Sequence, residues 1–432
     1  GHPDRVRSPR WHLGRSDWGG VHRNNGVGNK AAYLMSAGGN FNGYAIKGIG
    51  RERTARVWYQ ALTTRLTPAA NYVDLGDALL AACTDLAGGG GIDLGHCASV
   101  RDATRATEMH RTPRKQAPAT APVCGSGKRP VYLFRDDLED PSSGNWKRAR
   151  LAGGKTAWYY PQNPNGASGW DGTWASSGSL NFYAPDHGSR NDGYMRMTAA
   201  VELPAYAYLR FEHGYSFDRD ARRAYDGAII ELKVDGGPWQ QVGRGRFTHG
   251  RYNGAITRGT GNPLAGRSAW VGDSRGWAAA RVSLEKFAGS RVKVRFRMAS
   301  DRRHGGAGWY IDDVRIYACT KDQDKPTGSV VIDGDAATTT DARVALTLAY
   351  EDASTWVTKV RLSGSSRMGP NGKQLLKGIT MPARENISWD LSDTSFGGSG
   401  EPGAQRRVYA QVRDAAGNWS DVFSDAIAWV SP

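Results

Sequence analysis

The spacing of the apolar residues changes near residue 110, and this change limits the folds open to the chain. Up to about residue 108 the apolar residues follow helical spacing in segments bounded by glycine, proline or capping side chains. From Pro130 onward, short apolar segments alternate with polar positions and are separated by Gly, Asp, Asn and Pro. We therefore expect a multidomain chain, with a small all-α region followed by two antiparallel β-sandwiches.

Four helices are expected in the first region. The first runs from Asn29 to the glycines at 38 and 39, and the second spans residues 51–66 and ends at Thr67-Pro68. The third is capped by Asn71 or Asp74 and stops at the glycine run 88–91, and the fourth extends from about residue 96 to 108. The predicted buried face of the second helix consists of Ala55, Trp58, Leu62 and Leu66. Residues 1–22 and 40–50 are expected to form loops and turns.

The composition fits a chain of two to four domains with cores of their own, since it has 432 residues and 39% hydrophobic content. No run of about 18 apolar residues occurs, so no membrane partner is expected. The formal charge of +15 is spread along the whole length instead of forming a stripe or tail, so nucleic acid is not expected as a partner. The absence of a starting Met and of a signal sequence fits a truncated or processed chain.

The four cysteines fall into two pairs. Cys83 and Cys97 flank a Gly-rich loop between two helices, while Cys124 and Cys319 lie at the two ends of a domain-sized segment. This arrangement favours two disulfides and therefore an oxidising, extracellular compartment. None of the cysteines has the close Cys-x-x-Cys spacing of a zinc site.

Asp17 and His22 form the candidate catalytic pair. They are expected on a Gly-rich turn that leads into the first helix, where a carboxylate can hold one ring N–H of the imidazole. The other ring nitrogen then faces a substrate and can donate a hydrogen bond to a developing oxyanion. The alternative is that the two residues only cap or pack the turn.

A wider pattern favours the catalytic interpretation. The segments that carry it are Gly19-Gly20-Val21-His22, Asn24, Gly26, Asn29-Lys30-Ala31-Ala32-Tyr33-Leu34, Gly48-Ile49-Gly50-Arg51, Tyr59-Gln60-Ala61-Leu62-Thr63, Leu66-Thr67-Pro68, Asn71 and Thr84-Asp85-Leu86. Together with Asp17 they resemble the C-terminal helical subdomain of thermolysin-like zinc metallopeptidases. The resemblance covers about the first quarter of the chain. It implies that His22 binds the oxygen of the tetrahedral intermediate and that Asp17 orients His22.

The same resemblance shows what this chain lacks. The family holds its zinc with a His-Glu-x-x-His helix and a downstream Glu, and the Glu inside that helix is the general base. None of the nine histidines of this sequence begins such a pattern. The family's substrate-binding Arg has no counterpart either. The chain is therefore expected to be the distal part of a peptidase and to be inactive by itself.

Two further resemblances cover the β-rich regions. The segments Phe134-Arg135-Asp136-Asp137-Leu138-Glu139, Tyr225-Asp226-Gly227-Ala228 and Gly308-Trp309-Tyr310-Ile311-Asp312-Asp313-Val314 are similar to the MAM-like or immune-inhibitor-A-like jelly-roll module of secreted bacterial peptidases. The ending, residues 412–420, resembles bacterial immunoglobulin-like domains, and its Asp414 turn is interpreted as a hairpin turn and not as a site. The expected division is residues 1–110 helical, 111–127 linker, 128–319 jelly roll, 320–327 linker and 328–432 immunoglobulin-like.

Calcium is a possible ligand of the jelly roll. If the first and last strands pair, five carboxylates become neighbours: Asp136, Asp137, Glu139, Asp312 and Asp313. Clustered carboxylates suit Ca²⁺, which takes six to eight oxygen ligands, and the alternative is that they are solvated turn residues.

Six aromatic residues either stack on sugar rings or pack in the sandwich: Trp146, Trp158, Tyr159, Tyr160, Trp170 and Trp174.

Three functions remain open. The first is a secreted zinc metalloendopeptidase acting on proteins or peptides, of which this chain supplies the oxyanion-stabilising His and its orienting Asp. The second is a non-catalytic secreted adhesion protein whose sandwiches bind glycan or matrix. The third is reconstitution, in which a separate chain supplies the zinc-binding half.

Overall fold

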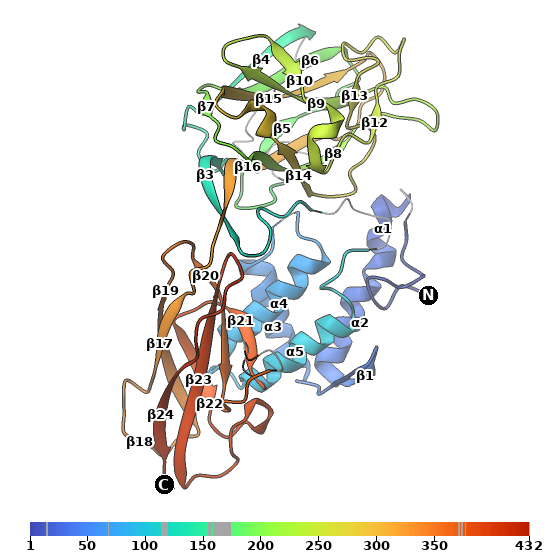
Figure 1. Ribbon diagram of the computed structural model, residues 1–432. Helices are drawn as coiled ribbons and strands as arrows, with labels where there is room; N and C mark the ends of the chain where they lie inside the picture. The colour runs from blue at the N-terminus through green and yellow to red at the C-terminus, as the bar shows by residue number, and fades with distance from the viewer. Residues whose placement is uncertain are drawn as a thin grey trace.

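The computed structural model describes residues 1–13, 16–67, 69–113, 120–153, 158, 174–369, 372, 375 and 377–431, and for residues 16–19 it describes the backbone only. Figure 1 shows a group of helices, a sandwich above it, and a second sandwich beside the helices. The predicted fold class, a small all-α region followed by antiparallel sandwiches, is confirmed. Within the described residues, no helix has both the length and the apolar content needed to cross a bilayer.

The helical part contains five helices and a small hairpin within the described residues. They are α1 (Ser16–Asn24), α2 (Gly26–Ala37), β1 (Gly39–Phe41), β2 (Tyr44–Ile46), α3 (Arg51–Thr64), α4 (Tyr72–Leu86) and α5 (Leu94–Ala106). Two sequence predictions are wrong. Residues 16–24 are helical where a loop and a turn were expected, and residues 39–46 form a hairpin instead of an irregular connection.

Tertiary contacts hold α1 in place despite its poor helix propensity. Gly20 has a φ of +96°, a value outside the helical range. The Asn24 side chain accepts a hydrogen bond from the backbone N–H of His12 at 2.9 Å and donates to its carbonyl at 3.2 Å. The Tyr72 hydroxyl donates to the Asn24 carbonyl at 2.8 Å. These contacts come from residues that are distant in sequence, which is why helical spacing alone did not predict α1.

The buried face of α3 also differs from the prediction. The residues that pack inward are Thr54, Val57 and Ala61, with Trp58 partly buried, whereas Leu62 is 66% exposed. Small side chains allow α3 to approach α2 and α4 closely, so the helix turns them toward the core instead of the larger Leu62. The predicted face is therefore rotated from the observed one.

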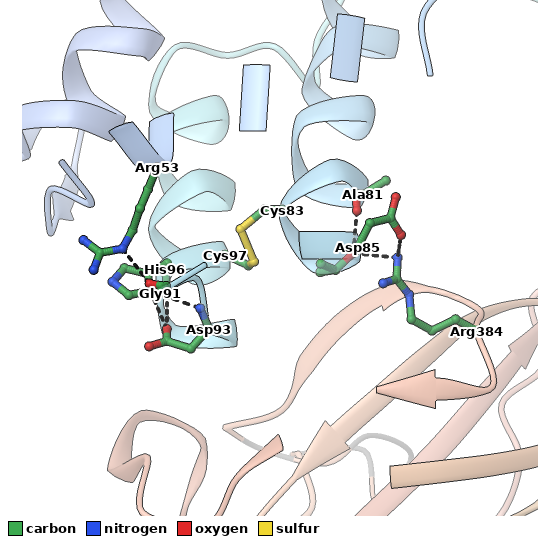
Figure 2. Close-up of a disulfide and its surroundings, with 10 residues drawn as sticks. Arg53, Ala81, Cys83, Asp85, Gly91, Asp93, His96, Cys97 and Arg384 are labelled. Atoms are coloured by element: carbon green, nitrogen blue, oxygen red, sulfur yellow. Dashed lines mark hydrogen bonds and ion pairs between the residues drawn. A yellow bond between two sulfur atoms is a disulfide. The ribbon is translucent and has the colours of Figure 1, made fainter. Parts of the chain in front are cut away.

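Capping side chains and a disulfide define α4 and α5 (Figure 2). Asn71 is the N-cap of α4, and Asp74 completes a capping box, so both predicted residues take part. Asp93 and His96 form the corresponding box at the start of α5. The predicted Cys83–Cys97 disulfide joins the two helices and is confirmed.

The first sandwich contains two six-stranded antiparallel sheets, ordered β10-β9-β15-β6-β4 with β7 beside β15, and β11-β14-β8-β16-β3 with β5 beside β16. The first and last strands pair with each other, which was the condition for the five carboxylates to be neighbours, and Val314 lies opposite Asp136 in the β3–β16 ladder. The predicted Cys124–Cys319 disulfide is also confirmed. The elements are β3 (Lys128–Asp136), β4 (Trp146–Gly153), β5 (Phe182–Ala184), β6 (Asn191–Met197), β7 (Val201–Glu202), β8 (Ala207–Ser216), β9 (Gly227–Val234), β10 (Trp239–Gln241), η1 (Arg244–Arg246), β11 (Phe247–His249), β12 (Gly254–Ala255), β13 (Ser268–Ala269), β14 (Ala278–Ser283), η2 (Glu285–Phe287), β15 (Arg291–Ser300) and β16 (Gly308–Lys321).

The second sandwich has a three-stranded sheet, β17-β19-β22, and a five-stranded sheet, β18-β24-β23-β20-β21. All strand pairs in it are antiparallel except the short parallel pair of β18 and β24. Its elements are β17 (Thr327–Ile332), β18 (Thr338–Thr339), β19 (Arg343–Glu351), β20 (Val357–Ser363), β21 (Ile379–Pro382), β22 (Asn386–Asp390), η3 (Thr394–Phe396), β23 (Ala404–Asp414) and β24 (Phe423–Trp429).

The helices pack against this second sandwich, and the buried apolar residues of both parts form one continuous cluster. Arg384, which lies between β21 and β22, donates to the Thr84 hydroxyl at 2.8 Å and pairs with Asp85 at 2.5 Å (Figure 2). Gly88 has a φ of +91°, and a Cβ at this position would lie 2.7 Å from the Cβ of Ser388. Glycine is therefore required there both by the backbone conformation and by the close approach of β22.

Candidate functional site

His22 lies on α1 and its side chain is exposed to solvent. The segment before α1 runs close to this helix, because a Cβ added at Gly20 would lie 3.0 Å from the ring of His12. Arg23 places its guanidinium 3.4 Å from Nδ1 of the same His12. The imidazole of His22 therefore stands on a helix that is fixed by its neighbours and is not packed into the interior.

Asp17 lies on the same helix, one turn and a half before His22 by sequence. Its side chain is outside the described residues, so the predicted contact between Asp17 and His22 stays a prediction.

Tyr72 of α4 contacts residues close to α1 in the sequence. The backbone N–H of Gly28 donates to the Tyr72 hydroxyl at 3.4 Å, and the ring of Trp11 meets that of Tyr72 edge to face at 5.9 Å. These contacts join α2 and the segment before α1 to Tyr72 of α4.

The helical part of the chain is similar in sequence to known metallopeptidases. Residues 2–107 match the family model of the thermolysin metallopeptidase alpha-helical domain. We call residues 2–107 the thermolysin-like segment. It contains all five described helices of the chain and the hairpin between α2 and α3.

Three curated relatives illustrate the match. Bacillolysin of Brevibacillus brevis is 47% identical over 88 residues, which are 20% of this chain and 16% of that protein. Thermolysin of Alicyclobacillus acidocaldarius is 46% identical over 88 residues, with the same coverage of 20% and 16%. A zinc metalloproteinase of Renibacterium salmoninarum is 48% identical over 69 residues, 16% of this chain and 12% of that protein. The chain thus spans about a sixth of the length of the first two relatives.

Solved structures resemble parts of this chain only weakly. A carbohydrate-binding module in complex with beta-1,4-galactotriose is 18% identical with a TM-score of 0.24, covering 43% of this chain and 99% of that one. The K1 cleaved adhesin domain of Lys-gingipain from Porphyromonas gingivalis is 17% identical with a TM-score of 0.25, covering 44% and 98%. Both TM-scores are too low to support an inference about function.

The residues of this chain do not fit a zinc site. Peptidase zinc is held by imidazole nitrogens and a carboxylate, and the sequence has no His-Glu-x-x-His. One group of three metal-ligating side chains has converging ligand atoms within the described residues, and it consists of carboxylates alone: Asp322, Asp352 and Asp414. Because His22 is not part of that group, we assign no step through zinc to this chain.

Asp136 and Glu139, two of the five predicted calcium ligands, are engaged by protein donors. Asp136 accepts from the side chains of Asn145 and Trp146 at 2.8 and 3.0 Å. Glu139 accepts from backbone and hydroxyl groups of Ser179 at 2.9 Å. These hydrogen bonds compensate the two carboxylates without a cation.

Asp137 is exposed, and its carboxylate accepts a hydrogen bond from the Glu139 N–H at 3.4 Å. The carboxylates of Asp312 and Asp313 on β16 also have partners within the protein. Asp312 accepts from Ser176 at 2.9 Å, and burial raises its pKa to about 7. Asp313 pairs with Arg315 at 2.6 Å. A calcium ion at these five carboxylates stays a prediction, and it would have to compete with the donors just described.

The described aromatic candidates pack inside the first sandwich. Trp146 contacts Phe182 edge to face at 5.1 Å, and Trp158 is 1% exposed and contacts Trp309 at 5.2 Å. Trp174 meets Tyr310 edge to face at 5.2 Å. Packing is thus the observed role of these three residues. Tyr159, Tyr160 and Trp170 lie outside the described residues.

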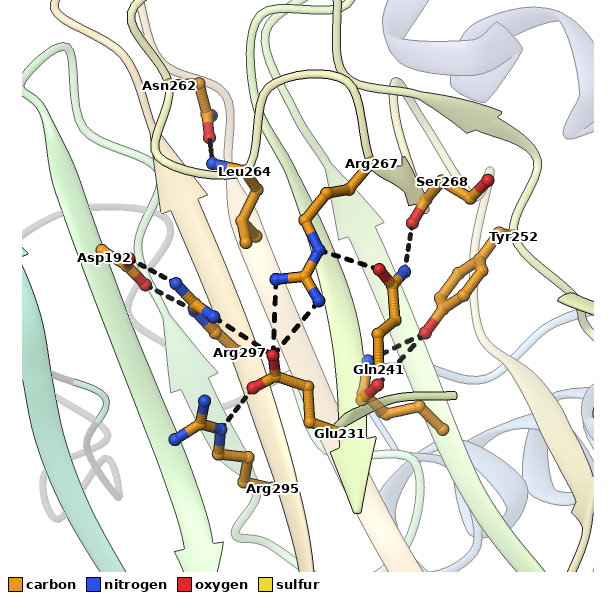
Figure 3. Close-up of polar contacts among 11 residues, drawn as sticks. Asp192, Glu231, Gln241, Tyr252, Asn262, Leu264, Arg267, Ser268, Arg295 and Arg297 are labelled. Atoms are coloured by element: carbon orange, nitrogen blue, oxygen red, sulfur yellow. Dashed lines mark hydrogen bonds and ion pairs between the residues drawn. The ribbon is translucent and has the colours of Figure 1, made fainter. Parts of the chain in front are cut away.

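A buried ion network covers the outer face of the sheet that contains β9, β15 and β6 (Figure 3). Glu231 is 2% exposed and accepts from Arg267, Arg295 and Arg297. Arg297 also binds Asp192 through two N–H groups, at 2.8 and 2.7 Å. Each charge has a partner of opposite sign, so the network ties neighbouring strands together.

Asp322, Asp352 and Asp414 form a carboxylate group that the sequence did not predict, and Asp414 was expected only in a hairpin turn. These residues come from a linker, a loop after β19 and the end of β23, and each is followed by polar or glycine-rich turn residues. Two sequence patterns could have indicated this group: Asp-x-Asp at residues 322–324 and Asp-x-x-Gly-Asn at residues 414–418. Neither segment is informative until the fold brings the two together.

Proposed function

We propose that the thermolysin-like segment is the helical half of the active site of a secreted zinc metalloendopeptidase. The observation that carries this proposal is the match of residues 2–107 to the thermolysin metallopeptidase alpha-helical domain. The exposure of His22 on α1 supports it, because a group that meets a substrate must reach the surface. Two disulfides support the secreted location.

In this proposal His22 donates a hydrogen bond to the oxyanion that forms when the scissile carbonyl becomes tetrahedral. Asp17 accepts from the other ring N–H, which fixes the tautomer and the direction of the donor. Both residues are positioning and stabilising groups. The metal and the general base belong to the other half of the site, whose residues this sequence does not contain.

The proposed domain division follows the sequence boundaries. Residues 1–110 form the peptidase subdomain, residues 128–319 the jelly roll and residues 328–432 the immunoglobulin-like sandwich, with linkers at 111–127 and 320–327. The two sandwiches are accessory domains in this arrangement.

The chain alone is expected to be inactive, because an oxyanion donor without a nucleophile and a base does not cleave a peptide bond. Peptide hydrolysis is measured with the full chain in the presence of Zn²⁺, beside a His22→Ala variant. Turnover above that of the variant would contradict the proposed division of labour.

A chimera tests His22 directly. The zinc-binding half of a thermolysin-like peptidase, with its His-Glu-x-x-His helix, is fused in front of the full chain, and peptide hydrolysis is measured. We expect His22→Ala to lower kcat by about 10²- to 10³-fold with a smaller effect on KM, since the donor acts in the transition state. The matched control is His110→Ala, which removes another exposed imidazole of the same part. A folded, active chimera in which both variants behave alike would refute the role of His22.

A further inference from the structure

Three carboxylates meet at the seam between the two sandwiches. Asp322 directly follows β16, Asp352 follows β19, and Asp414 is the last residue of β23. In Figure 1 the ends of β3 and β16 lead from one sandwich to the other at this level. The Asp322 N–H donates to the Gly127 carbonyl at 2.9 Å, and the Gly127 N–H donates to the Ala416 carbonyl at 3.2 Å. The seam is therefore built by segments of both sandwiches.

The geometry of the group suits a single cation. Each residue offers one carboxylate oxygen, and these three oxygens lie within 4.8 Å of one another. Two ligands on opposite sides of a Ca²⁺ ion are about 4.8 Å apart, twice a typical Ca–O distance of about 2.4 Å. One calcium ion can therefore contact all three oxygens without a large rearrangement.

Local hydrogen bonds engage one oxygen of Asp322, one oxygen of Asp352 and both oxygens of Asp414, whose Oδ2 accepts from the Asn418 side chain at 2.8 Å. Oδ1 of Asp322 accepts from the Asp324 N–H at 3.2 Å, and Oδ1 of Asp352 accepts from the Ser354 N–H at 3.1 Å. Oδ1 of Asp414 accepts from the N–H groups of Gly417 and Asn418. These bonds fix the direction of each carboxylate.

The two remaining oxygens have no partner among the residues that the structure describes. Oδ2 of Asp322 and Oδ2 of Asp352 are buried and make no hydrogen bond, and Asp322 as a whole is 2% exposed. Within the described residues, no Lys, Arg or His forms an ion pair with any of the three carboxylates. Buried carboxylate oxygens without a donor or a cation are costly, so this site calls for a positive ligand.

We propose that Asp322, Asp352 and Asp414 bind one calcium ion, which holds the two sandwiches in a fixed relation. Three carboxylates and no imidazole or thiolate make a hard, oxygen-only donor set, which excludes zinc and favours Ca²⁺. Bound water and nearby carbonyl oxygens complete its shell.

Calcium binding is tested on the full chain after removal of metal with EDTA. Titration with Ca²⁺ is followed by calorimetry, and Tm is measured with and without millimolar Ca²⁺. We expect Asp322→Asn and Asp352→Asn each to weaken one binding event at least about tenfold and to remove the Ca²⁺-dependent rise in Tm. The control is Asp421→Asn, which changes an 88% exposed carboxylate of the same sandwich and should bind like the wild type.

A second measurement separates lost binding from lost folding. Without Ca²⁺, each Asn variant should melt at the wild-type temperature or above, since it removes one of three mutually repelling charges. Ca²⁺ should also slow protease cleavage of the linker 320–327 in the wild type only. The proposal is overturned if the wild type shows no Ca²⁺-dependent change, if both Asn variants respond as the wild type does, or if Mg²⁺ is equally effective.

Discussion

At the scale of single residues, the first sandwich contains a pair of buried acids, Asp186 and Asp226. Asp226 is fully buried and Asp186 is 4% exposed. Burial, followed by the charge of Asp186, raises the pKa of Asp226 to about 9, and burial raises that of Asp186 to about 6. The two carboxyl groups therefore titrate as a coupled pair that shares one proton at neutral pH.

This pair makes the stability of the first sandwich depend on pH. A carboxyl whose folded pKa is raised binds a proton more tightly in the folded state, so stability falls as pH rises from its unfolded pKa of about 3.9 toward 9. Asp226→Asn mimics the protonated acid. We expect the Tm difference, wild type minus variant, to decrease steadily between pH 5 and pH 9 in EDTA-containing buffer. Parallel Tm curves would show that Asp226 is ionised in the folded protein.

At the scale of elements, α4 and α5 are specified by their ends. The Asn71 side chain accepts from the Val73 N–H at 2.7 Å, and Asp74 accepts from the Asn71 N–H at 2.8 Å. Spacing and capping residues predicted both helices, because these contacts are local. By contrast, the loop between them is held by α3, where Arg53 and Arg56 donate to the carbonyls of Gly91 and Gly90. That contact joins distant segments and no local pattern reveals it.

The cap of α4 makes a measurable contribution. Asn71→Ala removes the acceptor for the first helical N–H groups and should lower the free energy of unfolding by about 1 kcal/mol. Urea unfolding followed by the helical circular dichroism signal measures the change. Asn71→Ser keeps a capping oxygen and should remain within a few tenths of a kcal/mol of the wild type, as expected for a good N-cap. An equal loss of unfolding free energy in both variants would mean that the capping hydrogen bond does not contribute to stability.

At the scale of the molecule, the second sandwich covers part of the helical region. The two share one apolar cluster, and Arg384 and Arg343 pair with Asp85 and Asp93 across the contact. A cavity of about 340 Å³ between them is lined by residues of α4, α5, β20 and β21, and His22 is not among them. The sandwich therefore supports the helices on a side that does not include His22.

Removing residues 320–432 should destabilise the helices although it leaves their sequence intact. The deletion uncovers the apolar surface that packs on β21 and β22, so we expect a lower helical melting temperature and stronger binding of a hydrophobic dye. Arg384→Ala provides a milder control, because it removes the Asp85 contact and keeps the apolar cover. A deletion variant whose helices melt as in the full chain would show that the shared core is not needed.

The sequence by itself determined the order of helical and β-rich regions, four of the helices and the two cysteine pairs. These features depend on local spacing, capping residues or the ends of one domain. Only the tertiary structure decided that Ser16–Asn24 is helical, that Leu62 faces solvent, and that Asp322, Asp352 and Asp414 converge. Each of these depends on contacts between residues far apart in the chain, and such contacts form only when packing brings separate elements together.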